Sequence, residues 1–147
     1  MTKRSTAAIA AAILVLAACS PSRTAPTRAP ASSTAASAGE VVVILTDAMR
    51  MEPAKLTARV GVPVTFRITN TGQIEHEFYI GSEAEQTAHD AEMLAGPMHD
   101  HANGVSLLAG ETRSLTHTFG EAGTVLAGCH VPGHYGAGMV AEIVVTP

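Results

Sequence analysis

The sequence from residue 40 to residue 147 predicts an all-β domain with the architecture of an antiparallel β-sandwich. Seven short segments have the apolar runs or the apolar–polar alternation of β-strands. Turn-forming residues separate most of these segments, and their spacing is typical of small sandwiches. A single stretch with helical patterning interrupts the series, so the prediction is a sandwich with one inserted helix.

The predicted strands follow one another along the chain. The first is a nearly continuous apolar run, whereas the second and third alternate, as expected for strands with one buried face. The seven segments are residues 40–46, 55–60, 64–70, 76–81, 112–119, 124–129 and 139–145. Turns are expected at residues 61–63, 70–72, 108–111 and 120–123.

The interrupting stretch lies between the fourth and fifth strands. Ser82 is followed three residues later by Glu85, which is the capping-box signature of a helix N-terminus. Helix-forming residues then continue until Gly96 and Pro97, which end a helix. We therefore expect a short helix and a following loop, inserted around residues 82–104.

The first 39 residues differ from the rest and predict export. Lys3 and Arg4 precede an apolar run that is too short for a mature transmembrane helix and fits a signal peptide at residues 1–18. The sequence LAAC, which ends at Cys19, resembles a bacterial lipobox, in which the cysteine is lipidated. Ordinary signal-peptidase cleavage and an uncleaved anchor are the alternatives.

Residues 19–39 predict a lipidated, flexible linker. They are rich in Ser, Pro, Thr and Ala and lack hydrophobic periodicity, so they cannot bury a core. The chain is expected to be anchored to the membrane through Cys19. Residues 40–147 are expected to form the folded domain. We expect this domain at the outer face of the bacterial plasma membrane, in the periplasm or cell envelope.

The charge of the folded domain limits its partners. All 13 acidic residues of the chain lie at or after Glu40, but only five basic residues do, so the domain carries about −8 with neutral histidines. This disfavours nucleic acid and anionic lipid surfaces as partners. A basic partner, or simple solubility, fits the charge better.

Near the end of the chain, the segment CHVPGHYGAGM contains three soft metal donors. Cys129, His134 and Met139 fall within eleven residues, in a loop of glycines and a proline between two predicted strands. Thiolate, imidazole and thioether donors suit copper, and a blue-copper site needs one further histidine. Alternatively, Cys129 is a buried core residue, His134 a loop histidine and Met139 a strand anchor.

The candidate for the second imidazole is His76. It begins a predicted strand directly after a turn, so it can lie at the same end of the sandwich as the cysteine loop. His117 lies inside a predicted strand, and His130 should point away from the side that Cys129 faces. The remaining histidines belong to the inserted region.

With these two motifs, NTGQIEHEFYIG and GCHVPGHYGAGM, the domain resembles the cupredoxin family of the plastocyanin and azurin kind. The resemblance implies a Greek-key β-sandwich and one type 1 copper, with His76, Cys129 and His134 as equatorial ligands and Met139 as the axial ligand. It also implies that His134 is the ring through which electrons enter and leave.

The chain departs from the family pattern at two positions. Many cupredoxins have Asn after the first histidine, where it ties the two ligand loops together, and here the residue is Glu77. Many also have an aromatic residue two positions before the cysteine, and here it is Ala127. The first departure concerns the support around the ligands, and the second concerns packing under the metal.

A second group of donors lies in the inserted region. If the insert is helical, His89 and Met93 share one face. Thioether and imidazole donors suit a labile second copper site, and the alternative is a polar insert with a core-facing Met93 and solvated histidines. The members of this group are His89, Met93, Met98, His99, Asp100 and His101.

These observations leave three functions open. The first is a type 1 blue copper protein that carries single electrons outside the plasma membrane, as a monomer that meets redox partner proteins. The second is extracytoplasmic copper binding, buffering or resistance, with the His/Met insert used in addition to the blue-copper site. The third is a plain surface β-domain without metal. An enzyme is not expected, because the sequence shows neither an acid–base pair nor further copper centres.

Overall fold

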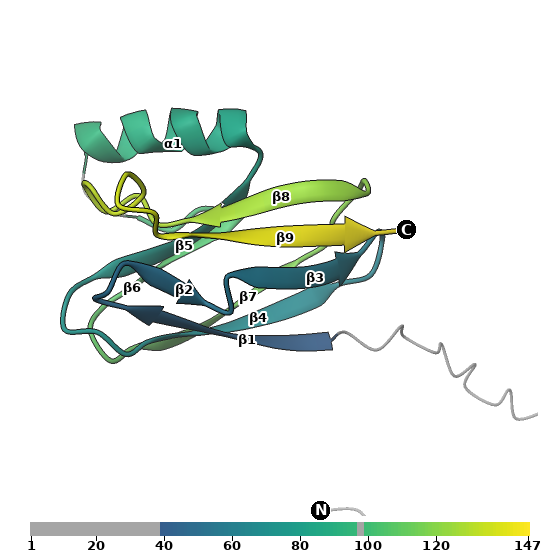
Figure 1. Cartoon of the computed structure of the whole chain (residues 1–147), viewed down its shortest axis with the longest axis horizontal. Helices are drawn as coiled ribbons and strands as arrows, with labels where there is room; N and C mark the ends of the chain where they lie inside the picture. Colours follow the sequence, from purple (N-terminus) through teal and green to yellow (C-terminus); the bar gives the residue numbers. More distant parts are fainter. Residues whose placement is uncertain (1–38, 97–98) are drawn as a thin grey trace, which may run out of the picture. The chain divides into compact units, whose positions relative to one another are not determined.

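The computed structural model of the chain describes residues 39–96 and 99–147. Two β-sheets lie face to face, and one helix lies outside them (Figure 1). The first sheet has the order β2–β1–β4–β7, with β1 at Gly39–Thr46, β2 at Arg50–Glu52, β4 at Val64–Asn70 and β7 at Thr112–His117. The second has the order β3–β9–β8–β5–β6, with β3 at Lys55–Arg59, β9 at Val140–Thr146, β8 at Gly123–Gly128, β5 at His76–Gly81 and β6 at Gly104–Leu107.

The structure confirms the all-β sandwich with one inserted helix. Each of the seven predicted strands is present, with its ends shifted by no more than two residues. Strands β2 and β6, which have 3 and 4 residues, are not among the predicted strands. Strands this short show too little alternation to be distinguished from loops.

Two pairs of strands depart from the antiparallel arrangement that the sequence predicts. Strand β1 runs parallel to β4, and β3 runs parallel to β9, whereas the other pairs within the described residues are antiparallel. A parallel pair needs a long crossover connection, and in both cases other strands lie between the two partners in sequence. Side-chain alternation shows which face of a strand is buried but carries no information about the direction of its neighbour.

Strand β5 is buried on both faces because the helix covers its outer side. Phe78 and Ile80 belong to the hydrophobic core between the sheets, where the ring of Phe78 lies 5.3 Å from that of Phe66. Tyr79, on the opposite face, stacks on His89 of the helix with ring centroids 3.8 Å apart. The alternation therefore places His76 on the core side of β5 and Glu77 on the helix side.

The helix α1, Glu83–Ala95, begins and ends as the sequence predicts. The Ser82 hydroxyl accepts from the backbone N–H of Glu85, and the Glu85 carboxylate accepts from the backbone N–H of Ser82, which completes the capping box. Gln86 fixes the helix to the sheet, because its amide donates to the carbonyls of Tyr79 at 3.1 Å and Leu126 at 3.0 Å. The helix therefore lies across β5 and β8 (Figure 1).

The predictions for the leader concern residues outside the described part of the chain. The signal peptide, the lipidated Cys19 and the linker up to residue 38 all fall there, as does Met98. Within residues 39–96 and 99–147, no helix is long and apolar enough to cross a membrane.

Candidate metal centre

The fold brings three of the four predicted ligands together at one end of the sandwich. His76 begins β5, Cys129 directly follows β8, and His134 lies in the loop that leads to β9. The Cys129 Sγ lies 3.4 Å from His134 Nδ1 and 4.0 Å from His76 Nδ1. The two Nδ1 atoms are 3.3 Å apart. One sulfur and two imidazole nitrogens thus converge on one point from parts of the chain more than 50 residues apart.

The loop from Cys129 to Met139 closes on itself through backbone hydrogen bonds. The Cys129 N–H donates to the Met139 carbonyl at 3.1 Å, and the Met139 N–H donates to the His134 carbonyl at 3.1 Å. Gly138 has a φ of 89°, a conformation that favours glycine. Met139 is fully buried, and its backbone is tied to two of the converging residues, Cys129 and His134.

The sulfur of Cys129 lies in a desolvated environment. Its side chain is fully buried, and burial raises the pKa of the thiol to about 12, although the backbone N–H of Glu77 donates to the sulfur at 3.3 Å. Burial likewise lowers the pKa of His134, with the nearby His76 as a further cause. The imidazole therefore stays neutral and able to bind a metal, while ionisation of the thiol needs the charge of a cation.

Asp47, which is not among the predicted site residues, orients His76. Its Oδ1 lies 3.2 Å from His76 Nε2, which leaves Nδ1 facing Cys129 and His134. Hydrogen bonding from the Gln73 N–H holds the pKa of Asp47 below its usual value. A side chain at Gly72 would collide with this carboxylate and would displace it. A carboxylate behind a ligating histidine is a common support of metal sites.

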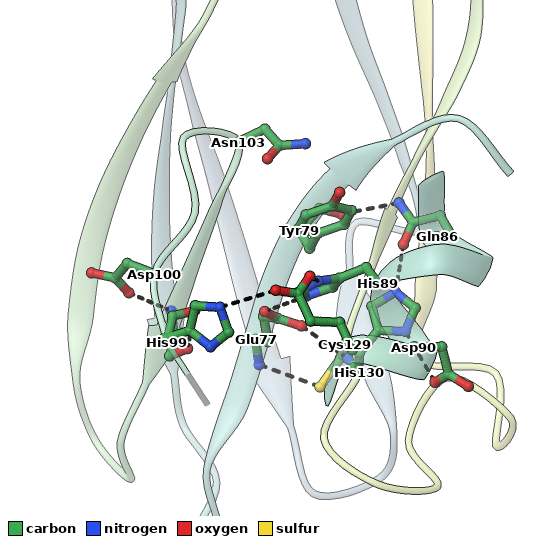
Figure 2. Close-up of polar contacts among 12 residues, drawn as sticks. Glu77, Tyr79, Gln86, His89, Asp90, His99, Asp100, Asn103, Cys129 and His130 are labelled. Carbon is green, nitrogen blue, oxygen red and sulfur yellow. Dashed lines mark hydrogen bonds and ion pairs between the residues drawn. The ribbon is translucent and has the colours of Figure 1, made fainter. Parts of the chain in front are cut away.

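Glu77 ties the strand of the first histidine to the loop of the cysteine. Its fully buried carboxylate accepts from the backbone N–H of His130 at 3.1 Å and lies 2.8 Å from His89 Nε2 (Figure 2). The backbone N–H of Glu77 donates to the Cys129 sulfur, so this one residue contacts the ligand loop through both its backbone and its side chain. The departure from Asn thus preserves a tie between the two loops and adds a contact to the helix.

The other departure, Ala127, is accommodated within the core. It is fully buried and lies between Ile80 of β5 and Ala141 of β9. Two small residues, Ala127 and Ala141, thus face each other on β8 and β9 at this level of the core.

His130 and His117 lie outside this centre, as the sequence predicts. His130 points to the helix side, where its ring lies 2.6 Å from Gln86 Oε1 and 3.2 Å from Asp90 Oδ1 (Figure 2). His117 ends β7 and packs beside Phe119. Burial lowers the pKa of both histidines.

The predicted donors of the inserted region do not form one group, because they differ in burial and in their partners. His89 and Met93 are buried on one face of α1, so the interpretation of His89 as solvated is wrong. Asp100 is held by Arg113 at 2.6 Å and is committed to that ion pair. His99 and His101 lie with Glu92 in a cluster whose potential ligand atoms are all within 4.8 Å of one another. Glu92 and Glu77, which also belong to these donor groups, are not among the donors predicted from the sequence.

Comparison with known proteins identifies a family and several relatives. The profile of the family described as copper binding proteins, plastocyanin/azurin family, matches residues 38–146. The copper-resistant cuproprotein CopI of Rubrivivax gelatinosus is 42% identical over 107 residues, which cover 71% of this chain and 65% of the relative. The protein of the same name from Vibrio cholerae is 40% identical over 112 residues, which cover 74% and 66%. The chain thus spans about two thirds of these relatives.

A more distant relative and two solved structures complete the comparison. The copper-resistant cuproprotein CopI of Pseudomonas aeruginosa is 30% identical over 144 residues, with 77% of this chain and 80% of the relative covered. Reduced auracyanin from Roseiflexus castenholzii superposes with a TM-score of 0.68 over 75% of this chain and 98% of its own, but at 24% identity it shows the fold alone. Auracyanin A of Chloroflexus aurantiacus, described as a "blue" copper protein, is 28% identical with a TM-score of 0.59 over 74% of this chain and 100% of its own.

Proposed function

The chain belongs to the plastocyanin/azurin family of copper-binding proteins, and on this basis we propose that His76, Cys129, His134 and Met139 hold its copper as one type 1 centre. The observation that carries the proposal is the convergence of Cys129 Sγ with the Nδ1 atoms of His76 and His134. Two imidazoles, one thiolate and a weak thioether are the donor set of blue-copper sites. Zinc fits less well, because structural zinc sites rarely use methionine.

The surrounding residues keep this donor set in a fixed arrangement. Copper bound here supplies reversible exchange of one electron between Cu(I) and Cu(II). Asp47 and Glu77 hold His76 and the cysteine loop through hydrogen bonds, and burial keeps water from the donors. His134 is 9% exposed, so its ring edge is where electrons or copper would pass between the centre and solvent.

The biological role that we propose is copper binding that protects the cell, as a resistance or buffering protein. The relatives named copper-resistant cuproprotein support this role, since they share 42% and 40% identity with most of the folded domain. The acidic domain, with its additional imidazole and carboxylate donors on the insert, also fits a protein that encounters free copper ions.

Electron transfer is the second candidate function. It is favoured by the buried, hydrogen-bonded ligand set and by the likeness to auracyanin A, which is described as a "blue" copper protein. Under this alternative the chain meets redox partner proteins at the His134 edge. In either role we propose that the chain is exported, is anchored through Cys19 and does not catalyse turnover of a substrate.

Growth of cells that lack the gene separates the two roles. For copper resistance, deletion should lower the copper concentration that stops growth. The wild-type chain should restore tolerance, and the Cys129→Ser chain should not. The His117→Ala chain, which changes a histidine outside the centre, is the matched control and should restore tolerance fully.

An opposite pattern would favour the electron carrier. If deletion leaves copper tolerance unchanged but slows respiratory or photosynthetic electron flow without added copper, the resistance role is wrong. Restoration of tolerance by the Cys129→Ser chain would contradict a role for the type 1 centre in resistance.

A further inference from the structure

The inserted region contains a second cluster of nitrogen and oxygen donors, separate from the type 1 centre. Glu92 lies on α1, and His99 and His101 lie in the segment that leads to β6. Glu92 Oε1 is 3.3 Å from His99 Nε2, and the rings of His99 and His101 are 4.4 Å apart. We propose that Glu92, His99 and His101 form a second metal site, which takes a divalent ion of the Cu(II) or Zn(II) class.

An independent feature of His101 indicates a missing ligand. Its Nε2 is buried and has no hydrogen-bond partner among the residues that the structure describes. Buried polar atoms in folded proteins nearly always have a partner, because an unsatisfied one costs about 1–3 kcal/mol. A metal ion in this cluster would give the imidazole such a partner.

The cluster is open to solvent on its Glu92 and His99 side. The side chains of these two residues are 53% and 49% exposed, so an ion can reach them without unfolding the helix. Figure 2 shows His99 at the side of the group that lies away from Cys129 and His130. The site would therefore exchange metal with the surroundings more readily than the buried type 1 centre.

A neighbouring set of donors, formed by Glu77, His89 and His101, fits a metal less well. Its potential ligand atoms also lie within 4.8 Å of one another. Both oxygens of Glu77 are already occupied, however, one by His89 Nε2 at 2.8 Å and one by the His130 N–H at 3.1 Å. A metal here would have to break the tie that holds the cysteine loop, whereas Glu92 makes only longer contacts of 3.5 Å and 3.3 Å.

The donor types define the class of ion. Two imidazoles and one carboxylate suit Cu(II), Zn(II) and similar divalent ions, whereas Cu(I) is favoured by thiolate and thioether donors. The net charge of about −8 on the folded domain further favours capture of a cation. The inference rests on the proposed copper-handling role only for the choice of Cu(II) as the ion to test.

The test uses the full chain, titrated with Cu(II) beyond one equivalent. Binding is followed by isothermal calorimetry and by electron paramagnetic resonance, because copper bound by imidazole and carboxylate has a wider copper hyperfine splitting than thiolate-bound copper and no intense visible absorption. We expect a second equivalent with that signature in the wild-type chain. Zn(II), added to the chain whose type 1 centre already holds one equivalent of copper, should reduce the binding of the second equivalent of Cu(II).

Two surface variants and one control assign the second equivalent. His99→Ala and Glu92→Gln should each weaken it by at least roughly 100-fold, at the upper end of the effect of losing a supporting residue. Both should keep the blue absorption, which reports that the fold is intact. His117→Ala, on β7, should retain both equivalents.

The outcomes separate this inference from the proposed function. A single equivalent in the wild-type chain, or a second equivalent that persists in both His99→Ala and Glu92→Gln, would overturn the second site. Loss of the second equivalent in Glu77→Gln with retention in His99→Ala would place it in the inner set instead and would also overturn the proposal. A second equivalent with the expected signature, but no blue absorption, would support the second site and contradict the type 1 centre.

Discussion

Glu77 illustrates, at the scale of a single residue, how one side chain connects two parts of this molecule. Its backbone N–H reaches the sulfur of Cys129, and its carboxylate contacts the backbone of His130 and the ring of His89. Because the carboxylate is fully buried, each of these contacts replaces hydration that was lost on folding. The residue is thus part of both the metal loop and the attachment of the helix.

Replacement of Glu77 by Ala should damage stability and copper binding together. The His130 N–H and the His89 ring would lose a buried partner, at a cost of about 1–3 kcal/mol, and copper affinity should fall about 10- to 100-fold. Urea unfolding and competitive copper titration measure the two effects. Glu121→Ala, on an exposed turn, is the control and should change neither. Unchanged copper affinity in Glu77→Ala would show that the tie is dispensable.

Asp47 has a narrower role, because it contacts one ligand from outside the centre. Asp47→Asn keeps the size of the side chain but removes the charge that faces His76 Nε2. We expect weaker copper binding, by about 10-fold, with little change in the stability of the metal-free chain, since the Asp47 side chain is 40% exposed and solvent screens its charge. Wild-type affinity in this variant would show that His76 needs no carboxylate behind it.

The elements around the centre differ in how well the sequence predicts them. The capping box, the stop at Gly96 and the alternating strands all follow from local patterns, and the structure confirms them. The short strands β2 and β6 and the two parallel pairings depend on contacts between distant segments, which no local pattern encodes. Asp47 and Glu92 could not be predicted as site residues for the same reason, since only folding places each of them beside a histidine.

The loop between β8 and β9 depends on glycine at a defined position. Gly138 has a φ of 89°, and an alanine there would be strained by about 1–2 kcal/mol. Because Gly138 directly precedes Met139, Gly138→Ala should lower stability and shift the visible spectrum of the copper form. Gly136→Ala is a matched control, since an added Cβ meets only the Gly133 carbonyl at 3.8 Å. Equal spectra and unfolding midpoints for the two variants would contradict this account of the loop.

At the scale of the whole domain, the loops, the helix and the core of the sandwich have separate roles. The loops at one end carry the ligands, the helix covers the adjacent face of the second sheet, and the core between the sheets fixes their distance (Figure 1). Sequence alone predicted the fold class and the candidate ligands, because the spacing of Cys129, His134 and Met139 is local and specific. It did not predict the supporting carboxylates, whose role depends on the packing of distant elements.

The folded chain without metal should lose stability as the pH falls. Burial lowers the pKa of His117, His130 and His134, so below the unfolded value of about 6.5 the unfolded chain binds more protons than the folded one. The stability that these neutral histidines contribute is fully present above the unfolded pKa. It is lost as the pH falls through the lowered pKa values of the folded chain. Urea midpoints at pH 7.5 and pH 5.5 measure this, and His117→Gln should lose part of the dependence. A midpoint that rises on acidification would contradict the assignment.

The most direct test of the central claim, a type 1 copper held by His76, Cys129, His134 and Met139, is the visible spectrum after addition of Cu(II). The wild-type chain should show an intense thiolate-to-copper absorption, and Cys129→Ser should lose it while His117→Ala retains it. Weak copper bands that are the same in the wild-type chain and in Cys129→Ser would mean that copper binds elsewhere and that the converging ligands do not form the centre.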